Sequence, residues 1–115
     1  MPRPRSPSTA AELAGSASVF AALGDETRLR LVSRMCDEGA LSISRLAAGS
    51  DVTRQAVTKH LRVMEAAGLV RETRRGRESI WELEPERLEE ARRSIDLISK
   101  QWDVTLGRLK KFVER

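Results

Sequence analysis

The stretch 53–65 combines an apolar stripe with a face of hydrogen-bond donors. Thr53 can cap a helix N-terminus, because its hydroxyl accepts a backbone N–H. Apolar residues then recur at helical spacing and mark one buried face: Ala56, Val57, Leu61 and Met64. The other side carries no carboxylate before Glu65 and presents donors: Arg54, Gln55, Thr58, Lys59 and Arg62. The spacing predicts an amphipathic helix.

Such a donor face suits phosphates and base edges, which are recognised by side-chain N–H and O–H groups. We therefore interpret this stretch as a DNA recognition helix. Taken alone, it fits an ordinary amphipathic surface helix equally well, so the neighbouring segments must decide.

Three shorter helical patterns precede this stretch. The first, 17–23, contains Val19, Phe20 and Leu23 and stops at Gly24. Asp25 can cap the second, which reaches Gly39 with an apolar repeat of Leu29, Val32 and Met35 or Cys36. Ser42 or Ser44 can cap the third, which ends at Gly49. A short helix, a tight turn and a donor-rich helix make a helix-turn-helix.

After the predicted recognition helix the period changes. Gly68 can end that helix in the left-handed conformation. Two short runs, 69–74 and 79–83, are typical of strands, and the glycine-containing segment 75–78 between them predicts a hairpin turn. This wing would carry Arg74, Arg75 and Arg77 at its tip, where arginines can hold phosphates or enter a minor groove. The alternative is a solvated arginine-rich turn.

Basic charge is concentrated in the same region. The chain has 21 Lys and Arg against 17 Asp and Glu, a net charge of +4 that does not by itself establish a polyanionic partner. Between 53 and 77, however, the only acids are Glu65 and Glu72, and the bases are Arg54, Lys59, Arg62, Arg71, Arg74, Arg75 and Arg77.

The last predicted helix begins at Pro85 and carries a seven-residue apolar repeat. Such a repeat is typical of a helix that pairs with another long helix. Because the rest of the chain is too small to cover the apolar surface, we expect a homodimer; burial within the monomer is the alternative. The predicted interface residues are Val19, Phe20, Leu88, Ile95, Ile98, Trp102, Leu106, Leu109 and Phe112.

These segments predict one mostly α domain, a winged helix-turn-helix with a small β-hairpin wing and a long C-terminal dimerisation helix, over residues 17–115. Residues 1–16 are expected to form a flexible tail, with a basic minor-groove arm as the alternative. Cys36 is the only cysteine, so no intramolecular disulfide can form. We found no apolar run of membrane-spanning length and no signal-peptide core, which favours a cytoplasmic protein.

An enzyme is excluded by the side chains available. The chain has no tyrosine, one histidine and one cysteine. It also lacks a glycine-rich phosphate loop, so nothing assembles a nucleophile, a base and an orienting group. No cofactor is expected. A winged-helix module that binds an acidic protein remains as an alternative.

In this order, the segments resemble the ArsR family of bacterial winged-helix repressors. The resemblance rests on Leu23-Gly-Asp-Glu-Thr-Arg-Leu-Arg-Leu31, Thr53-Arg-Gln-Ala-Val-Thr-Lys-His-Leu61 and Glu65-Ala-Ala-Gly-Leu-Val70. It implies a dimer joined mainly through the first and last helices, bound to double-stranded DNA at a roughly palindromic operator. Family members typically repress transcription, often of their own operon, until an inducer binds. The expected DNA contacts are Thr53, Arg54, Gln55, Thr58, Lys59, His60, Arg62, Arg74, Arg75 and Arg77.

Metal-sensing members carry a Leu-Cys-Val-Cys-Asp-Leu segment, where this chain reads Leu41-Ser-Ile-Ser-Arg-Leu46. Serines are poor ligands for soft metals. The family's second metal site uses Asp and His on the last helix, which here has Asp96 and Asp103 but no histidine. We therefore expect no metal site and place the chain in the non-metal branch, whose inducers are mostly undefined.

Two single residues keep alternative roles at this point. His60 either contacts DNA directly or packs against the wing. Cys36 is expected to be a small buried apolar residue, with redox sensing as the alternative.

Overall fold

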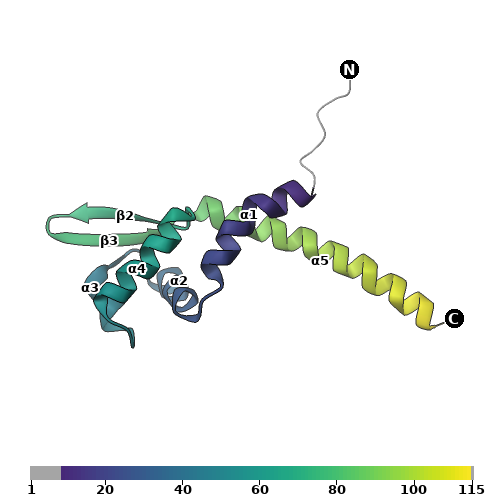
Figure 1. Ribbon diagram of the computed structural model, residues 1–115, viewed down its shortest axis with the longest axis horizontal. Coiled ribbons are helices and arrows are strands. Elements are labelled where there is room, and N and C mark those ends of the chain that lie inside the picture. Colours follow the sequence, from purple (N-terminus) through teal and green to yellow (C-terminus); the bar gives the residue numbers. More distant parts are fainter. Residues whose placement is uncertain (1–8, 115) are drawn as a thin grey trace, which may run out of the picture.

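The computed structural model describes residues 9–114, which form five helices and a three-stranded antiparallel sheet (Figure 1). The predicted winged helix-turn-helix is confirmed. In chain order the elements are α1 (Thr9–Leu23), α2 (Glu26–Glu38), β1 (Leu41–Ser42), α3 (Ile43–Ala48), α4 (Arg54–Ala66), β2 (Val70–Arg75), β3 (Glu78–Leu83) and α5 (Pro85–Val113).

Local capping determines where three of these helices begin. Asp25, Ser42 and Thr53 each accept the backbone N–H of the residue three positions later, at 3.0, 3.1 and 3.1 Å. Of the two serines proposed for α3, it is Ser42 that caps. Gly68 ends α4 as predicted: its φ is +78°, and the N–H groups of Gly68 and Leu69 bond back to the last turn, as in a Schellman motif.

The wing is a hairpin extended by a third strand. In β2 and β3, Arg75 pairs with Glu78, which leaves a two-residue loop whose first residue, Gly76, has a φ of +60°. A positive φ at this position alone is the requirement of a type II′ turn. Strand β1 was not predicted, because two residues carry no periodicity. It pairs Leu41 with Trp81 and so joins the wing to the start of α3.

One hydrophobic core lies beneath α2, α3, α4 and the sheet. Its most buried side chains include Leu31, Met35, Leu46, Val57, Leu61, Met64, Leu69 and Trp81. The expected apolar face of α2 was wrong in part. Leu31 and Met35 are its buried pair, Leu29 is 50% exposed, and Cys36 is exposed rather than buried.

Helix α1 is longer than predicted. It begins at Thr9 rather than near Ala17, so residues 9–16 belong to a helix and not to a tail; residues 1–8 lie outside the described part of the chain. Ser16 on α1 is buried and hydrogen-bonded to the Ser94 hydroxyl of α5 at 2.7 Å. This bond gives the early turns of α1 a tertiary partner, which the sequence did not reveal.

The second half of helix α5 extends away from the rest of the molecule, since residues 99–114 are all exposed. Figure 1 shows the β2–β3 hairpin, α3 and α4 at one end and the last turns of α5 at the other. The radius of gyration is 18.8 Å, against about 13 Å for a compact chain of this length. In the described residues, no helix combines the length and apolarity that a membrane span requires.

Candidate nucleic-acid interface

The first turns of α4 present most of the predicted donors to solvent. Arg54, Gln55 and Lys59 are exposed, and Thr53, also exposed, caps the helix. Thr58 is half-buried, and its hydroxyl donates to the Arg54 carbonyl at 3.0 Å. That bond uses the only donor of the Thr58 side chain, so the lone pairs of the hydroxyl and the methyl group remain for an outside partner.

The predicted wing arginines are exposed at the hairpin. Arg75 and Arg77 flank Gly76, and Arg74 donates to the Ser79 hydroxyl across the hairpin at 3.4 Å. The hairpin and α4 lie at the same end of the molecule (Figure 1). The fold therefore brings together two basic surfaces that are separate in the sequence.

Arg62, one of the predicted DNA contacts, has partners within the protein. Its Nη1 lies 3.0 Å from Glu65 on α4 and 2.9 Å from Glu72 on the wing, and its guanidinium stands 4.9 Å from the centre of the Trp81 ring. Hydrogen bonds to Glu65 and Glu72 raise the pKa of Arg62. Hydrogen bonds from Ser79 and then Arg62 lower the pKa of Glu72. In the sequence Glu72 is only one of two acids in a basic stretch, and it is the strand register that brings this acid to α4.

His60 packs against α2 rather than the wing, so the predicted alternative place for its ring was wrong. Its Nδ1 lies 3.2 Å from Nη1 of Arg28 and 3.8 Å from the Asp25 carboxylate. Since a guanidinium can only donate, Nδ1 accepts, and a neutral ring carries its hydrogen on Nε2. Arg28 also donates through Nε to the Ala22 carbonyl of α1, and its backbone N–H lowers the pKa of Asp25.

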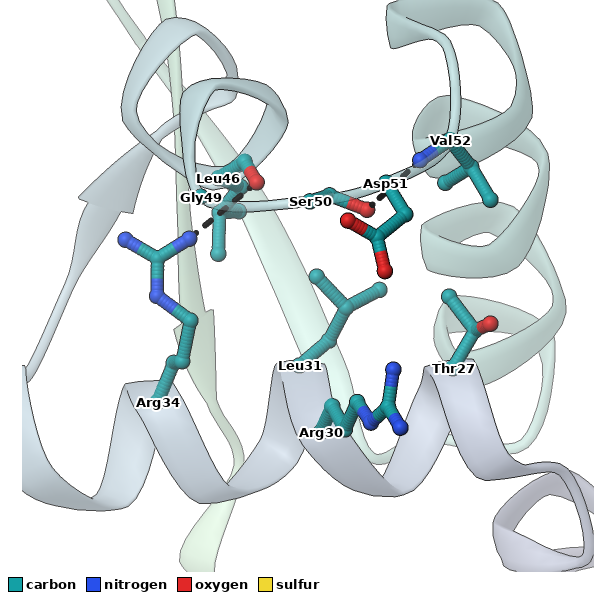
Figure 2. A pocket seen from close by; sticks show the side chains of 9 residues that line it. All are labelled: Thr27, Arg30, Leu31, Arg34, Leu46, Gly49, Ser50, Asp51 and Val52. Carbon is teal, nitrogen blue, oxygen red and sulfur yellow. Dashed lines mark hydrogen bonds between the residues drawn. The ribbon is translucent and has the colours of Figure 1, made fainter.

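A small cavity lies between α2 and the turn that joins α3 to α4 (Figure 2). Arg34 spans one side of it and donates to the carbonyls of Arg45 and Leu46, each at 3.1 Å. A side chain at Gly49 would overlap this guanidinium. The volume, about 70 Å³, is far below the roughly 300 Å³ of small-molecule sites. We therefore conclude that Arg34 holds α2 against α3 within the helix-turn-helix. The cavity is lined by Thr27, Arg30, Leu31, Arg34, Leu46, Gly49, Ser50, Asp51 and Val52.

The predicted interface residues divide into two groups. Val19 is fully buried in the protomer's own core, so it was wrongly assigned to the interface. Phe20 and Leu88 are partly buried against the same core, and Ile98 is partly buried as well. The remaining residues are at least half exposed on α5: Ile95, Trp102, Leu106, Leu109 and Phe112.

The two serines at the cysteine positions of metal-sensing relatives are not arranged as a ligand pair. Ser42 is buried and its hydroxyl caps α3, whereas Ser44 is exposed. Asp96 and Asp103 both lie on exposed positions of α5. Within residues 9–114, no three His, Cys, Asp or Glu side chains are grouped so that they could hold a metal ion.

Comparisons with known proteins agree with this geometry. A family described as a helix-turn-helix domain matches residues 23–73. The chain is 36% identical over 75 residues to the HTH-type transcriptional regulator Rv2034 of Mycobacterium tuberculosis, covering 65% of this chain and 69% of the relative. An ArsR-like transcriptional regulator from Rhodococcus sp. RHA1 has 37% identity and a TM-score of 0.71, covering 87% of this chain and 93% of that one.

A more distant structure shares the fold alone. It is the homodimeric winged helix-turn-helix DNA-binding domain of a possible ArsR-family regulator from Mycobacterium bovis, with 22% identity and a TM-score of 0.62. The match covers 89% of this chain and 91% of that chain.

Together, the fold, the donor-bearing helix and the wing define a winged helix-turn-helix DNA-binding protein. Within that class, the chain belongs to the ArsR family of transcriptional regulators. It is a regulator of transcription and not an enzyme.

Replacing both Arg75 and Arg77 by alanine should weaken binding to every duplex, because exposed wing arginines are suited to phosphates rather than bases. For each phosphate that is no longer neutralised, the negative slope of log K against log salt concentration should become shallower by about 0.9. Binding to random duplex, titrated from low to moderate salt, measures this. Arg108→Ala, on exposed α5, is the control, and an unchanged slope in the double variant would remove the wing from the interface.

Proposed function

We propose that the chain is a homodimeric repressor that binds a roughly palindromic operator, including one upstream of its own coding sequence. We also propose that its inducer does not act through the family's metal sites. The observation that carries this proposal is the exposed donor face at the start of α4, at the same end as the arginine wing. A two-fold dimer would place its α4 helices in successive major grooves, with half-sites about 34–36 Å apart.

The dimeric state is supported by the apolar face of α5. Trp102 and Leu109 are more than half exposed, and isolated protomers rarely leave several large apolar side chains in water on one face. The M. bovis protein with the same fold is a homodimer. In this proposal residues 17–115, together with the early turns of α1, form one DNA-binding and dimerisation domain.

Base reading is assigned to the start of α4. Gln55 and Thr58 are the first choices, with Arg54 as a further candidate, and the amide of Gln55 can bond adenine bidentately. Lys59 and the wing arginines would hold phosphates. His60 would contact DNA through Nε2 only, because its Nδ1 accepts a hydrogen bond from Arg28.

Metal independence is supported by the chemistry of the replaced positions. A serine hydroxyl is a poor ligand for soft metals, and that of Ser42 is already used as the α3 cap. The chain's single histidine, His60, lies on α4, so α5 contributes only carboxylates such as Asp96 and Asp103. Cys36 alone cannot build a tetrahedral site.

The deciding experiment is binding to the DNA immediately upstream of the protein's own coding sequence, with excess random competitor. Competitor-resistant binding by a dimer, unchanged by zinc or by a chelator, supports the proposal. Release by zinc would overturn metal independence and direct the search to Asp96, Asp103 and His60. Failure to bind would overturn autorepression.

Replacing Gln55 by alanine should reduce the preference for operator over random duplex by about 1–3 kcal/mol, the value of one bidentate base contact. Affinity for random DNA should change little, because glutamine carries no charge. Lys59→Ala is the matched control on the same helix face, and it should weaken both duplexes equally. Full discrimination by the Gln55 variant would show that another face of α4 reads the bases.

A further inference from the structure

We propose that Glu72 of the wing and Arg62 of α4 form a clasp that fixes the wing against the recognition helix, and that Glu72 thereby determines operator specificity. Arg62 is then a positioning residue and not a phosphate ligand. This inference rests on the proposed function, since specificity is meaningful only for a protein that reads a DNA sequence.

The clasp is held from both sides. One terminal nitrogen of Arg62, Nη1, is 2.9 Å from Glu72 and 3.0 Å from Glu65. On the wing, the second oxygen of Glu72 accepts from the Ser79 hydroxyl at 2.5 Å. Glu72 therefore bonds to its neighbouring strand and to α4 at the same time, and its position follows the register that pairs it with Trp81.

Arg62 also covers the core beneath the clasp. Its guanidinium lies over the ring of Trp81, which is 1% exposed. A guanidinium over an indole face is attracted by the ring's π electrons and shields it from water. If Arg62 turned toward a phosphate, it would leave two carboxylates and uncover a core tryptophan, so the geometry favours the clasp.

The sign of the charge gives a second reason. A carboxylate near a DNA-binding face repels phosphates, yet Glu72 lies within a basic segment and next to α4. Glu72 keeps its charge there because Ser79 and Arg62 lower its pKa. As the recognition helix and the wing must meet DNA together, an acid that joins them can improve base reading while reducing nonspecific attraction.

The test measures affinity for the upstream operator and for random duplex of equal length with Glu72→Gln, Arg62→Met and the double variant. Because Glu72→Gln removes a negative charge and one of the two carboxylate partners of Arg62, it should bind random duplex at least as tightly as the wild type. The ratio of its affinity for the operator to its affinity for random duplex should nevertheless fall about tenfold, which lies within the range of coupling between two residues in contact. The double variant should fall no further than the worse single variant.

Glu82→Gln and Arg71→Met form the matched control, an ion pair of 2.7 Å within the wing strands. Neither should change the ratio. If Glu72→Gln strengthens both duplexes equally, Arg62 is a phosphate ligand and the clasp is overturned. An operator-to-random ratio that neither Glu72→Gln nor Arg62→Met changes overturns the clasp too.

Failure of the proposed function is a separate outcome. If the proposed function fails, the wild-type protein does not prefer the operator over random duplex. If only the clasp fails, the wild type prefers the operator and the Glu72 variant prefers it equally. In the former case, urea unfolding of the same four proteins tests the clasp itself. If the unfolding equilibrium constant of the double variant differs by about tenfold from the product of the two single effects, the clasp is supported. If the two single effects simply multiply, the clasp is overturned.

Discussion

Trp102→Asp should convert the protein to a monomer and weaken operator binding by more than about 100-fold, the effect expected when two linked half-sites bind separately. Trp102 is 59% exposed in the protomer, in the middle of the apolar face of α5. A carboxylate there would have to be buried without a partner in the paired state, which is strongly unfavourable.

The folded protomer should survive this substitution, because the last turns of α5 are exposed on all sides. Far-UV circular dichroism should therefore be unchanged while sedimentation reports the smaller species. Binding to random duplex should drop much less than binding to the operator.

Val104→Asp is the matched control for the dimer prediction. Val104 is 54% exposed, close to the 59% of Trp102, but two residues along a helix is a turn of about 200°, so it points to the opposite side of α5. This variant should remain dimeric. A dimeric Trp102→Asp protein would show that another surface joins the subunits.

Leu46→Ala should destabilise the domain by about 2–5 kcal/mol, as is typical when a buried leucine is truncated. Leu46 is fully buried and faces the small cavity between α2 and the α3–α4 turn (Figure 2). The substitution would enlarge an existing space that Leu31 and the braced Arg34 cannot easily fill. Since small domains have only about 5–15 kcal/mol of stability, this is a large fraction.

Urea unfolding followed by circular dichroism measures the Leu46 effect. Leu29→Ala on α2 removes the same atoms from a half-exposed position and should cost about 0.5 kcal/mol or less. Because α3 supports α4, operator affinity should fall in the Leu46 variant even where it remains folded. Equal stabilities of the two variants would mean that α3 does not pack as described.

Much of the fold could be read from neighbouring residues alone. The caps at Asp25 and Thr53, the helix end at Gly68 and the hairpin at Gly76 each depend on atoms only a few positions apart, whereas for α3 the sequence left Ser42 and Ser44 as alternatives. The same applies to the apolar and donor faces of α4, because helical spacing places them. These are short-range effects, so the sequence contains them in full.

Side-chain partners from distant segments could not be read in this way. The sequence determined which faces of α4 and α5 are apolar or basic, together with the order helix, turn, helix, wing and long helix. Only the tertiary structure decided that Val19 belongs to the core, that Arg28 holds His60, and that Glu72 meets Arg62. Periodicity describes one element at a time, whereas these pairings depend on how two elements pack.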